Sequence, residues 1–488
     1  MSAVADAFTE TFAAGFASYG DRPCIEFDGR WHTGTDVTGY AAALGTALDD
    51  AGVDRRAPVG LVVRNRVTHA AAIAGFLAGG RWVSMIYSFQ SPEAIARDVE
   101  QLAVAAVVAD AEDWSEPVLH AARRCGRGGV ALWPEAPRVV AQASGEQPPA
   151  PATAGLQILT SGTTGPPKRQ AIDAKALQRT VFSVTGGQFA TRDDPPELSY
   201  WPFGGIGVCQ LIAGIATGRR IVLLEKFSVA GWVRAVREHR IPRGGVQPAV
   251  VRMLLDADVA PGDLASLQYL ISASGPLDPR TRDEFEDRFG IPIRLAYGAT
   301  EFAGSVCAWT PDLVERFGAS KRDSVGCALP DTEVRIVDQD TGSDVPTGER
   351  GILEARIPVL SDGWIRTTDV ASIDSDGFVT LHGRADGAII RGGFKILPET
   401  VRQVLLDHPG VRDACVVGVR DDRLGEVPFA AFEPARQPVP TDADLRDWVR
   451  AALPVHHVPV AVVAVDELPR TPSLKVRLPE VAALYGNG

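Results

Sequence analysis

The chain has 488 residues, too many for one ordinary hydrophobic core, so we expect two or three structural units. Hydrophobic residues make up 45% of the sequence and the formal net charge is −12. An acidic chain without a basic stripe is not expected to bind nucleic acid. The six cysteines (positions 24, 125, 209, 307, 327 and 415) form no CxxC pair or zinc spacing, which indicates reduced thiols.

The N-terminal segment and the apolar runs favour a cytoplasmic protein without a membrane partner. Asp6 and Glu10 lie where a signal peptide would carry basic residues. The longest apolar run, residues 70–80, is too short to cross a bilayer and is expected to form a core helix.

Helical and strand-like patterns alternate over residues 1–140. This alternation favours an α/β fold with parallel strands. The expected elements are a helix at 37–51, a strand at 59–63, a helix at 70–77 and a strand at 104–108. A Pro- and Ala-rich loop at 142–154 is expected to separate two subdomains.

The stretch 160–168 reads T-S-G-T-T-G-P-P-K and follows an expected strand at 156–159. Its hydroxyls and backbone N–H groups suit phosphate oxygens, and Lys168 adds a positive charge. It is not a Walker A loop, because Lys168 is followed by Arg169 instead of Ser or Thr. A mobile polar linker is the alternative that this stretch alone leaves open.

Two later stretches add groups suited to a nucleotide. Strands are expected at 221–224 and 267–272, and the second is followed by a turn of small residues where a flat ring can approach the backbone. The run Y-G-A-T-E at 297–301 then offers a ring, a hydroxyl, and a carboxylate able to bind Mg²⁺.

The last third of the chain changes character twice. Short strands are expected at 333–337, 351–356 and 378–382, and Asp369 among them is a candidate to accept hydrogen bonds from ribose hydroxyls or, alternatively, to cap a turn. A polar, Gly-flanked break then precedes a helix around 401–405. Two more expected strands, at 414–419 and 461–465, complete a small α+β domain. We therefore predict domains at 1–383 and 384–488, with a hinge near Asp386.

With these motifs in order, the sequence resembles the adenylate-forming (ANL) superfamily, which includes acyl-CoA synthetases and acyl-AMP ligases. The resemblance spans nearly the whole chain. It is carried by five stretches, at 160–168, 297–301, 363–369 (G-W-I-R-T-T-D), 383–399 and 469–477 (P-R-T-P-S-L-K-V-R). It implies a large N-terminal domain of parallel-type sheets with helices, a small β-barrel-like subdomain, and a small mobile α+β C-terminal domain.

The resemblance also implies a two-step reaction with ATP, Mg²⁺ and coenzyme A. A carboxylate attacks the α-phosphorus of ATP and releases pyrophosphate, and a thiol then takes the acyl group from the acyl-adenylate. This chemistry needs positioning and charge neutralisation more than covalent catalysis by the protein.

Motif position assigns the roles that the resemblance implies. The set expected at the β- and γ-phosphates is Thr160, Ser161, Gly162, Thr163, Thr164, Gly165 and Lys168. The set expected at the adenine and ribose is Ser274, Gly275, Pro276, Tyr297, Asp369 and Arg384. Thr300 would contact the α-phosphate, Glu301 would hold Mg²⁺, and Lys475 would stabilise charge on the reacting carboxylate and α-phosphate. Lys395 would contact a phosphate.

The implied hinge residue is Asp386. The small domain would rotate about it between the two half-reactions. Gly392 and Gly393 would then let a pantetheine arm pass close to the backbone.

The acid-binding segment departs from the family pattern. Acyl-CoA ligases usually read P-L-F-H where this chain has Pro202-Phe203-Gly204-Gly205. We expect Phe203, Gly204, Gly205 and Gly298 to line an enlarged pocket for a bulky aryl or polycyclic acid, as used in secondary metabolism. The alternative is that neighbouring side chains refill the space. Residues 201–208 contain no Asp to pair an α-ammonium group, so an α-amino acid is not expected.

Three smaller departures, Arg169, Thr368 and Leu474, replace usual glycines but spare the charged groups. Three functional hypotheses therefore remain. The protein is an acid–CoA ligase, an acyl-AMP ligase that passes its product to a carrier-protein thiol or a separate transferase, or an inactive nucleotide-binding scaffold. A monomer or a homodimer is equally compatible with the sequence.

Overall fold

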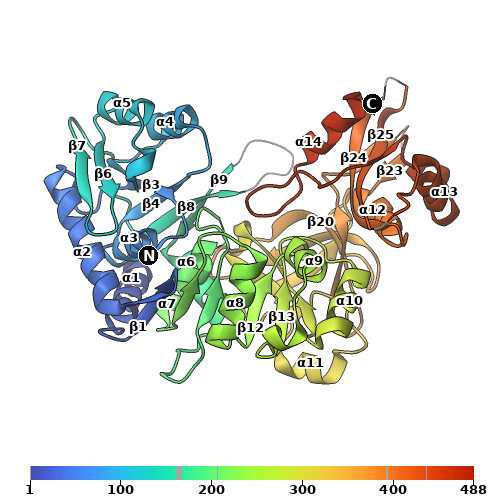
Figure 1. The fold of residues 1–488 in the computed structure, drawn as a ribbon, viewed down its shortest axis with the longest axis horizontal. Coiled ribbons are helices and arrows are strands. Elements are labelled where there is room, and N and C mark those ends of the chain that lie inside the picture. Colours follow the sequence, from blue (N-terminus) through green and yellow to red (C-terminus); the bar gives the residue numbers. More distant parts are fainter. Residues whose placement is uncertain are drawn as a thin grey trace.

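The structure, a computed structural model, describes residues 2–160, 168–205, 207–391, 394–421, 423–435 and 437–487. The chain runs from an N-terminal sheet with its helices, through a central part, to a small C-terminal domain at the opposite end of the molecule (Figure 1). This mixed α/β architecture, with a large N-terminal and a small C-terminal part, confirms the expected fold class.

A seven-stranded sheet forms the first part, in the order β7-β6-β5-β3-β4-β8-β9. The five inner strands are parallel, and the two edge strands are antiparallel to their neighbours. Three inner strands are buried along their whole length, which explains why nearly all of their residues are apolar or glycine. The strands are β3 (Val59–Val63), β4 (Trp82–Tyr87), β5 (Ala106–Asp110), β6 (Gly128–Leu132), β7 (Arg138–Ala141), β8 (Gly155–Thr160) and β9 (Lys168–Asp173).

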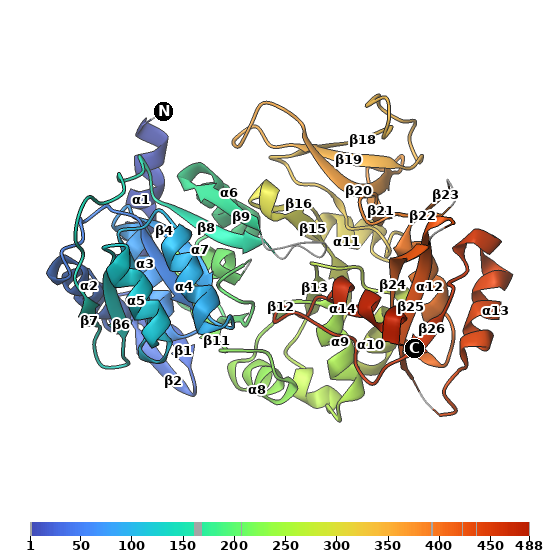
Figure 2. The ribbon, with the colours of Figure 1, turned by 90° about the horizontal axis from the view of Figure 1, so that it is seen from above.

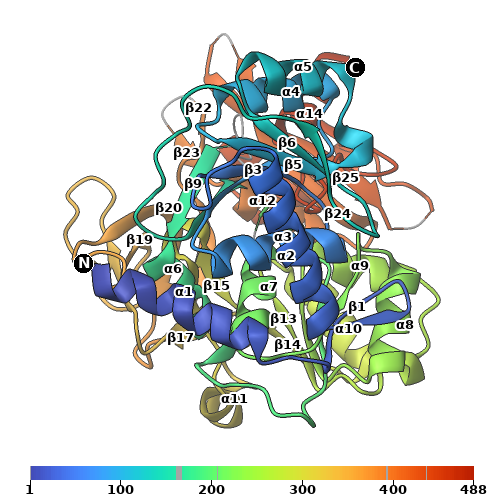
Figure 3. The ribbon, with the colours of Figure 1, turned by 90° about the vertical axis from the view of Figure 1, so that its left-hand side faces the viewer.

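Helices cover both faces of this sheet. Leu61 and Val108 contribute to the core shared with α1, α2 and α3, whereas Val62 and Val107 contribute to the core shared with α4 and α5. Figure 3 shows α1 and α2 on the outside of the molecule. The helices are α1 (Ser2–Ala17), α2 (Gly34–Asp50), α3 (Val67–Ala78), α4 (Pro92–Gln101), α5 (Glu116–Arg124) and α6 (Ala174–Thr185), with the 3₁₀ turn η1 (Ala111–Asp113).

The Pro- and Ala-rich loop at 142–154 does not separate two subdomains. It joins β7 to β8, and both strands belong to the seven-stranded sheet. The expectation failed because a loop's composition marks irregular backbone but not which strands the loop connects.

Two further sheets form the central part, and their strands are mostly parallel. The orders are β10-β11-β1-β2, with only β2 antiparallel, and β12-β13-β14. Side chains of α8, α9 and α10 share a second core with strands of both sheets. The strands are β1 (Pro23–Phe27), β2 (Arg30–Thr33), β10 (Glu197–Ser199), β11 (Ile221–Leu223), β12 (Arg243–Val246), β13 (Tyr269–Ser272) and β14 (Ile293–Leu295). The helices are α7 (Gly207–Ala216), α8 (Val229–His239), α9 (Pro248–Asp256) and α10 (Pro279–Phe289), with η2 (Pro261–Leu264).

Antiparallel strands follow, and Figure 2 shows them above the central part. They form a three-stranded sheet, β15-β16-β17, and a four-stranded sheet, β18-β19-β20-β21, which share one core. Among the described strands both sheets are open, so the expected barrel-like subdomain is not a closed barrel. The elements are β15 (Tyr297–Ala299), η3 (Thr300–Phe302), β16 (Gly304–Ala308), α11 (Pro311–Phe317), β17 (Cys327–Ala328), β18 (Glu333–Val337), β19 (Gly351–Arg356), β20 (Ile365–Ile373) and β21 (Val379–Arg384).

The C-terminal elements build one further sheet, β23-β22-β25-β24, to which β26 adds beside β25. One core packs α12 and α13 against this sheet, and a second core packs α14 against it. The elements are β22 (Ile389–Arg391), β23 (Phe394–Ile396), α12 (Pro398–Leu406), β24 (Val411–Asp421), β25 (Gly425–Pro434), α13 (Asp442–Ala452), η4 (Val455–His457), β26 (Val462–Ala464), α14 (Leu478–Ala483) and η5 (Leu484–Asn487).

Within the described ranges, no helix is both long and apolar enough to span a bilayer. All six cysteines are free thiols, as their spacing predicted.

Candidate active site

Three of the expected nucleotide-binding residues meet where β15, β20 and β21 lie together. Asp369 of β20 is the direct partner of Arg384, the last residue of β21. Tyr297, the first residue of β15, is buried and donates its hydroxyl hydrogen bond to the Asp369 carboxylate. Residues 72 positions apart are thus joined by a single hydrogen bond.

The Asp369 carboxyl has a raised pKa. Burial is the largest cause, and it outweighs the hydrogen bond from Tyr297 and the charge of Arg384, both of which lower the pKa. A carboxylate in this setting accepts hydrogen bonds and is suited to hydroxyl donors such as those of ribose.

Arg384 is held by two neighbours that the sequence reasoning did not connect to it. Its Nε lies 2.9 Å from Asp386 Oδ1, and its Nη2 donates to Thr368 Oγ1 at 2.9 Å. Thr368, one of the departures from the family pattern, therefore has a specific partner. The expected hinge residue and the expected ribose-binding residue form one ion pair.

Lys475 of the C-terminal domain is electrostatically coupled to this group. Burial is the main reason that its pKa lies below the usual lysine value, and the nearby Arg384 lowers it further, whereas Glu301 acts in the opposite direction. Its backbone is fixed by two hydrogen bonds. Thr471 N donates to Lys475 O at 2.7 Å, and Lys475 N donates to Thr471 Oγ1 at 3.2 Å.

The Glu301 carboxylate suits a metal bound together with phosphates. Glu301 is exposed in η3, directly after Thr300, and no hydrogen bond or ion pair within the described residues occupies its carboxylate. No cluster of three metal-ligating side chains occurs in that part of the chain. Mg²⁺ commonly binds through one or two carboxylates plus substrate phosphates, so a lone free carboxylate fits this mode.

Gly298 has a structural reason to be glycine. A Cβ there would lie 2.5 Å from Gly304 O and 2.7 Å from Ser305 Cα, because β15 and β16 approach closely at this pair. The turn after β13 is exposed at Ser274, Gly275 and Pro276, and Ser274 adopts a φ of 69°. This strained serine matches the tight turn expected there.

Several expected residues lie outside the described part of the chain. These are Ser161, Gly162, Thr163, Thr164 and Gly165 of the phosphate loop and the two glycines Gly392 and Gly393. The backbones of Thr160 and Lys168 pair as the last register position of β8 and β9. Lys395 pairs with Ile390 between β23 and β22.

The expected acid-binding segment is partly refilled. Phe203 is buried in the core shared with α1, α2 and α3, and its backbone N–H donates to Asn65 Oδ1 at 2.9 Å. A Cβ at Gly204 would lie 2.5 Å from Tyr87 Cε1, so the Tyr87 ring occupies that space. Among the described residues, the nearest atom to such a Cβ at Gly205 is Pro202 O at 3.9 Å, so these residues leave the position open.

Two buried polar groups beside this segment were not predicted from the sequence. Trp201 Nε1 and Gln210 Oε1 are buried without a hydrogen-bond partner among the described residues. Both side chains face Gly245 of β12, since a Cβ there would lie 3.6 Å from Trp201 Nε1 and from Gln210 Nε2. Buried donors and acceptors normally have partners, so unpaired ones are candidates for ligand contacts.

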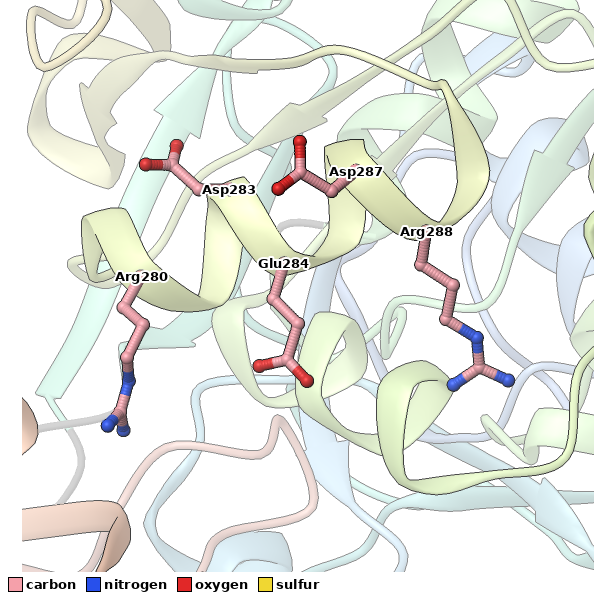
Figure 4. A pocket seen from close by; sticks show the side chains of 5 residues that line it. All are labelled: Arg280, Asp283, Glu284, Asp287 and Arg288. Carbon is pink, nitrogen blue, oxygen red and sulfur yellow. The ribbon is translucent and has the colours of Figure 1, made fainter. Parts of the chain in front are cut away.

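A hollow elsewhere is lined by charged side chains along α10 (Figure 4). Its lining residues are Arg280, Asp283, Glu284, Asp287 and Arg288, none of which belongs to a motif. Ligand pockets are mostly apolar and enclosed, so this open, charged hollow is not a candidate acid site. Arg280 also donates to Val411 O at 2.6 Å, which places the hollow beside the C-terminal domain.

Comparison with known families defines the class as adenylate-forming enzymes. The AMP-binding enzyme model matches residues 12–364, and the model of the AMP-binding enzyme C-terminal domain matches residues 401–475. The chain belongs to the AMP-binding enzyme family, as the five motifs predicted, and the use of ATP follows from this membership.

Individual relatives agree with this class. The chain is 28% identical to a 4-coumarate–CoA ligase-like protein of Oryza sativa subsp. japonica, over 85% of this chain and 81% of that protein. It is 30% identical to an indoleacetate–CoA ligase of Aromatoleum aromaticum, over 68% of each. The structure of the amide bond synthetase McbA from Marinactinospora thermotolerans superposes with a TM-score of 0.79, at 26% identity over 98% of this chain and all of that one. The expected enzyme class, an AMP-forming acid–thiol ligase, is confirmed.

Proposed function

We propose that the protein activates an aromatic carboxylic acid with ATP and transfers the acyl group to coenzyme A. The observation that carries this proposal is the pairing of Asp369 with Arg384, to which Glu301 and Lys475 of the C-terminal domain are electrostatically coupled. These groups are a carboxylate for ribose hydroxyls, the arginine paired with it, a carboxylate for a metal ion, and a cation for developing negative charge.

The residues perform the first step by orientation and charge. Asp369 accepts hydrogen bonds from the ribose, and Thr300 fixes an α-phosphate oxygen. Glu301 would hold Mg²⁺, which neutralises phosphate charge when bound. Lys475 donates to the carboxylate of the acid and the α-phosphate as the new bond forms, and its partial burial strengthens this interaction. The Lys475 ammonium thereby lowers the barrier without exchanging its proton.

The acid is proposed to lie beside Gly245 and Trp201. At Gly245 of β12 no side chain comes between the strand and these two groups, and the unpaired Trp201 N–H and Gln210 carboxamide oxygen supply a donor and an acceptor. One relative is named an indoleacetate–CoA ligase, and another is named for its likeness to 4-coumarate–CoA ligases; both of these acids are aromatic. We therefore propose an aryl acid with a polar ring substituent, which refines the bulky aryl or polycyclic acid expected from the sequence.

A pyrophosphate-release screen over aliphatic, aryl and polycyclic acids tests this assignment, with and without coenzyme A. We expect aryl acids with polar ring substituents to give the highest kcat/KM. Trp201→Phe keeps the ring but removes the N–H, so it should raise the acid's KM about tenfold with little effect on kcat. Equal activity on short aliphatic acids would refute the proposed substrate class.

An amine is the second candidate acceptor. It is favoured by one observation, the 26% identity to an amide bond synthetase over nearly the full length of both chains. Adding coenzyme A, a carrier-protein thiol or a primary amine to separate reactions distinguishes the acceptors, because only the true one accelerates release of AMP. Acid-dependent exchange of pyrophosphate into ATP would exclude an inactive scaffold.

A further inference from the structure

A buried carboxylate ties the C-terminal domain to the central part of the molecule. Asp413 lies in β24 and is 1% exposed. Its oxygens contact three guanidinium groups, from Arg252 of α9 at 2.8 Å, Arg402 of α12 at 3.0 Å and Arg470 at 2.6 Å. Burial alone would raise the Asp413 pKa, but the three arginines together lower it to about 2, so the carboxylate stays ionised.

Arg252 is itself rigidly placed in the large domain. Its second nitrogen lies 2.8 Å from Asp278 Oδ2, and Asp278 caps α10 by accepting from Thr281 N at 2.9 Å. Arg252 and Asp278 are both buried. Asp413 therefore contacts a guanidinium whose position is set by two helices of the central part.

Arg470 carries this contact on to the segment that ends in Lys475. While one of its nitrogens contacts Asp413, another donates to Leu474 O at 3.2 Å. Leu474 immediately precedes Lys475, so the carbonyl that Arg470 holds belongs to the peptide bond leading into the lysine.

Leu474 makes a second attachment through its side chain. This side chain packs against the core that α8, α9 and α10 share with strands of the central part, which includes Trp201 and Val246. Leu474 has a φ of 62°, a conformation that a leucine adopts only when its surroundings hold it there. A glycine would adopt this backbone without strain but would lack the apolar contact.

We propose that Asp413 and Leu474 are positioning residues, which hold the segment ending in Lys475 in place from two sides. The ion cluster fixes the segment's backbone through Arg470, and the leucine side chain anchors it on the large domain. This inference rests on the proposed function, in which Lys475 acts in adenylate formation.

A second contact between the domains provides the matched control. Arg412 reaches Asp256 at 3.3 Å, but both side chains are substantially exposed, and among the described residues neither forms an ion pair or hydrogen bond with residues 469–477. Exposed pairs of this kind contribute little. Asp256→Asn should therefore leave both half-reactions within about twofold of the wild-type values.

The test compares Asp413→Asn and Leu474→Gly with this control. Exchange of pyrophosphate into ATP measures the first step, and thioester formation from supplied acyl-adenylate and coenzyme A measures the second. We expect kcat for exchange to fall about ten- to a hundredfold, with the KM for ATP and the rate of the second step within about twofold. Leu474→Met keeps an apolar side chain, so this variant should retain most of the wild-type rate of pyrophosphate exchange.

A structural readout accompanies the kinetics. Hydrogen exchange of the peptide covering residues 469–477 should accelerate in both variants and not in Asp256→Asn, while the melting temperature of Leu474→Gly stays close to wild type. The inference would be overturned if Leu474→Gly left the rate of pyrophosphate exchange unchanged. It would also be overturned if this variant lost both half-reactions equally. If the wild-type protein lacks acid-dependent pyrophosphate exchange, the proposed function fails, and unaltered hydrogen exchange at 469–477 would then refute the positioning role separately.

Discussion

The Tyr87 ring lies where a side chain at position 204 would project, with Cε1 2.5 Å from the Cβ that Gly204 lacks. Tyr87 ends β4 and stacks on Phe89 with ring centroids 4.5 Å apart. The glycine at 204 is thus explained by an aromatic ring from another strand, and the two residues should be energetically coupled.

Gly204→Ala is expected to destabilise the fold by about 1–3 kcal/mol, because the new methyl group overlaps the ring. Tyr87→Ala removes the obstacle, so the double variant should be more stable than the sum of the single effects predicts, by about 1 kcal/mol or more. Denaturant unfolding of the four proteins measures this coupling. Strictly additive effects would show that the ring does not fill the space.

Arg169 replaces the glycine usual at its position, and the structure gives it two partners. It donates to Met85 O at 2.6 Å and pairs with Asp98 at 2.7 Å, both largely buried contacts. Arg169→Gly should therefore lower the free energy of unfolding by about 1–3 kcal/mol. As a control, Arg316→Ala removes only an exposed pair with Asp312 and should change stability by less than about 0.5 kcal/mol. Equal effects of the two substitutions would contradict this role of Arg169.

The acid side of the pH profile should depend on Asp369. Burial raises the Asp369 pKa above 3.8. Binding of ATP, which needs the ionised carboxylate, is therefore lost as the pH falls through this raised value. The Tyr297 hydroxyl lowers that pKa, and Tyr297→Phe should therefore raise it further. The acid limb of kcat/KM for ATP is expected to move to higher pH in this variant.

Tyr40→Phe serves as the control, because that hydroxyl donates to Trp133 O, far along the chain from the site. Tyr40→Phe should leave the acid limb of kcat/KM for ATP at the wild-type pH. A limb that stays at the same pH in Tyr297→Phe would refute the coupling between Tyr297 and Asp369.

The alkaline limb of the pH profile of adenylate formation should depend on Lys475. Because burial and Arg384 lower its pKa below 10.5, the ammonium is lost, and adenylate formation falls, at a lower pH than for an exposed lysine. Lys475→Arg stays charged throughout the accessible range, so its residual pyrophosphate exchange should lack this limb. Persistence of the same alkaline limb in Lys475→Arg would assign it to another group.

Regular elements were predictable wherever the local pattern was strong. The strands expected at 59–63, 333–337 and 351–356 have those bounds, since buried or alternating apolar residues define them directly. The expected strand at 104–108 begins two residues later, at Ala106, because Val104 and Ala105 are buried without joining the ladder. Apolar character reports burial, whereas strand bounds depend on hydrogen bonds.

The charged groups of the candidate site were predictable from motifs, but their mutual arrangement was not. Nothing local to Asp413 or Arg252 indicates that residues 161 positions apart share a buried ion pair. The same holds for Tyr87 and Gly204, which belong to different strands and loops. Such contacts arise from the packing of distant segments, and a single sequence carries no pattern that reports them.

The most direct test of the account is a comparison of the two half-reactions in Lys475→Ala. Acid-dependent pyrophosphate exchange should fall by about a hundredfold or more, since the charge that stabilises the first transition state is gone. Thioester formation from supplied acyl-adenylate and coenzyme A should remain within about threefold of the wild-type rate. Equal losses in both half-reactions would contradict the assignment of Lys475 to adenylate formation.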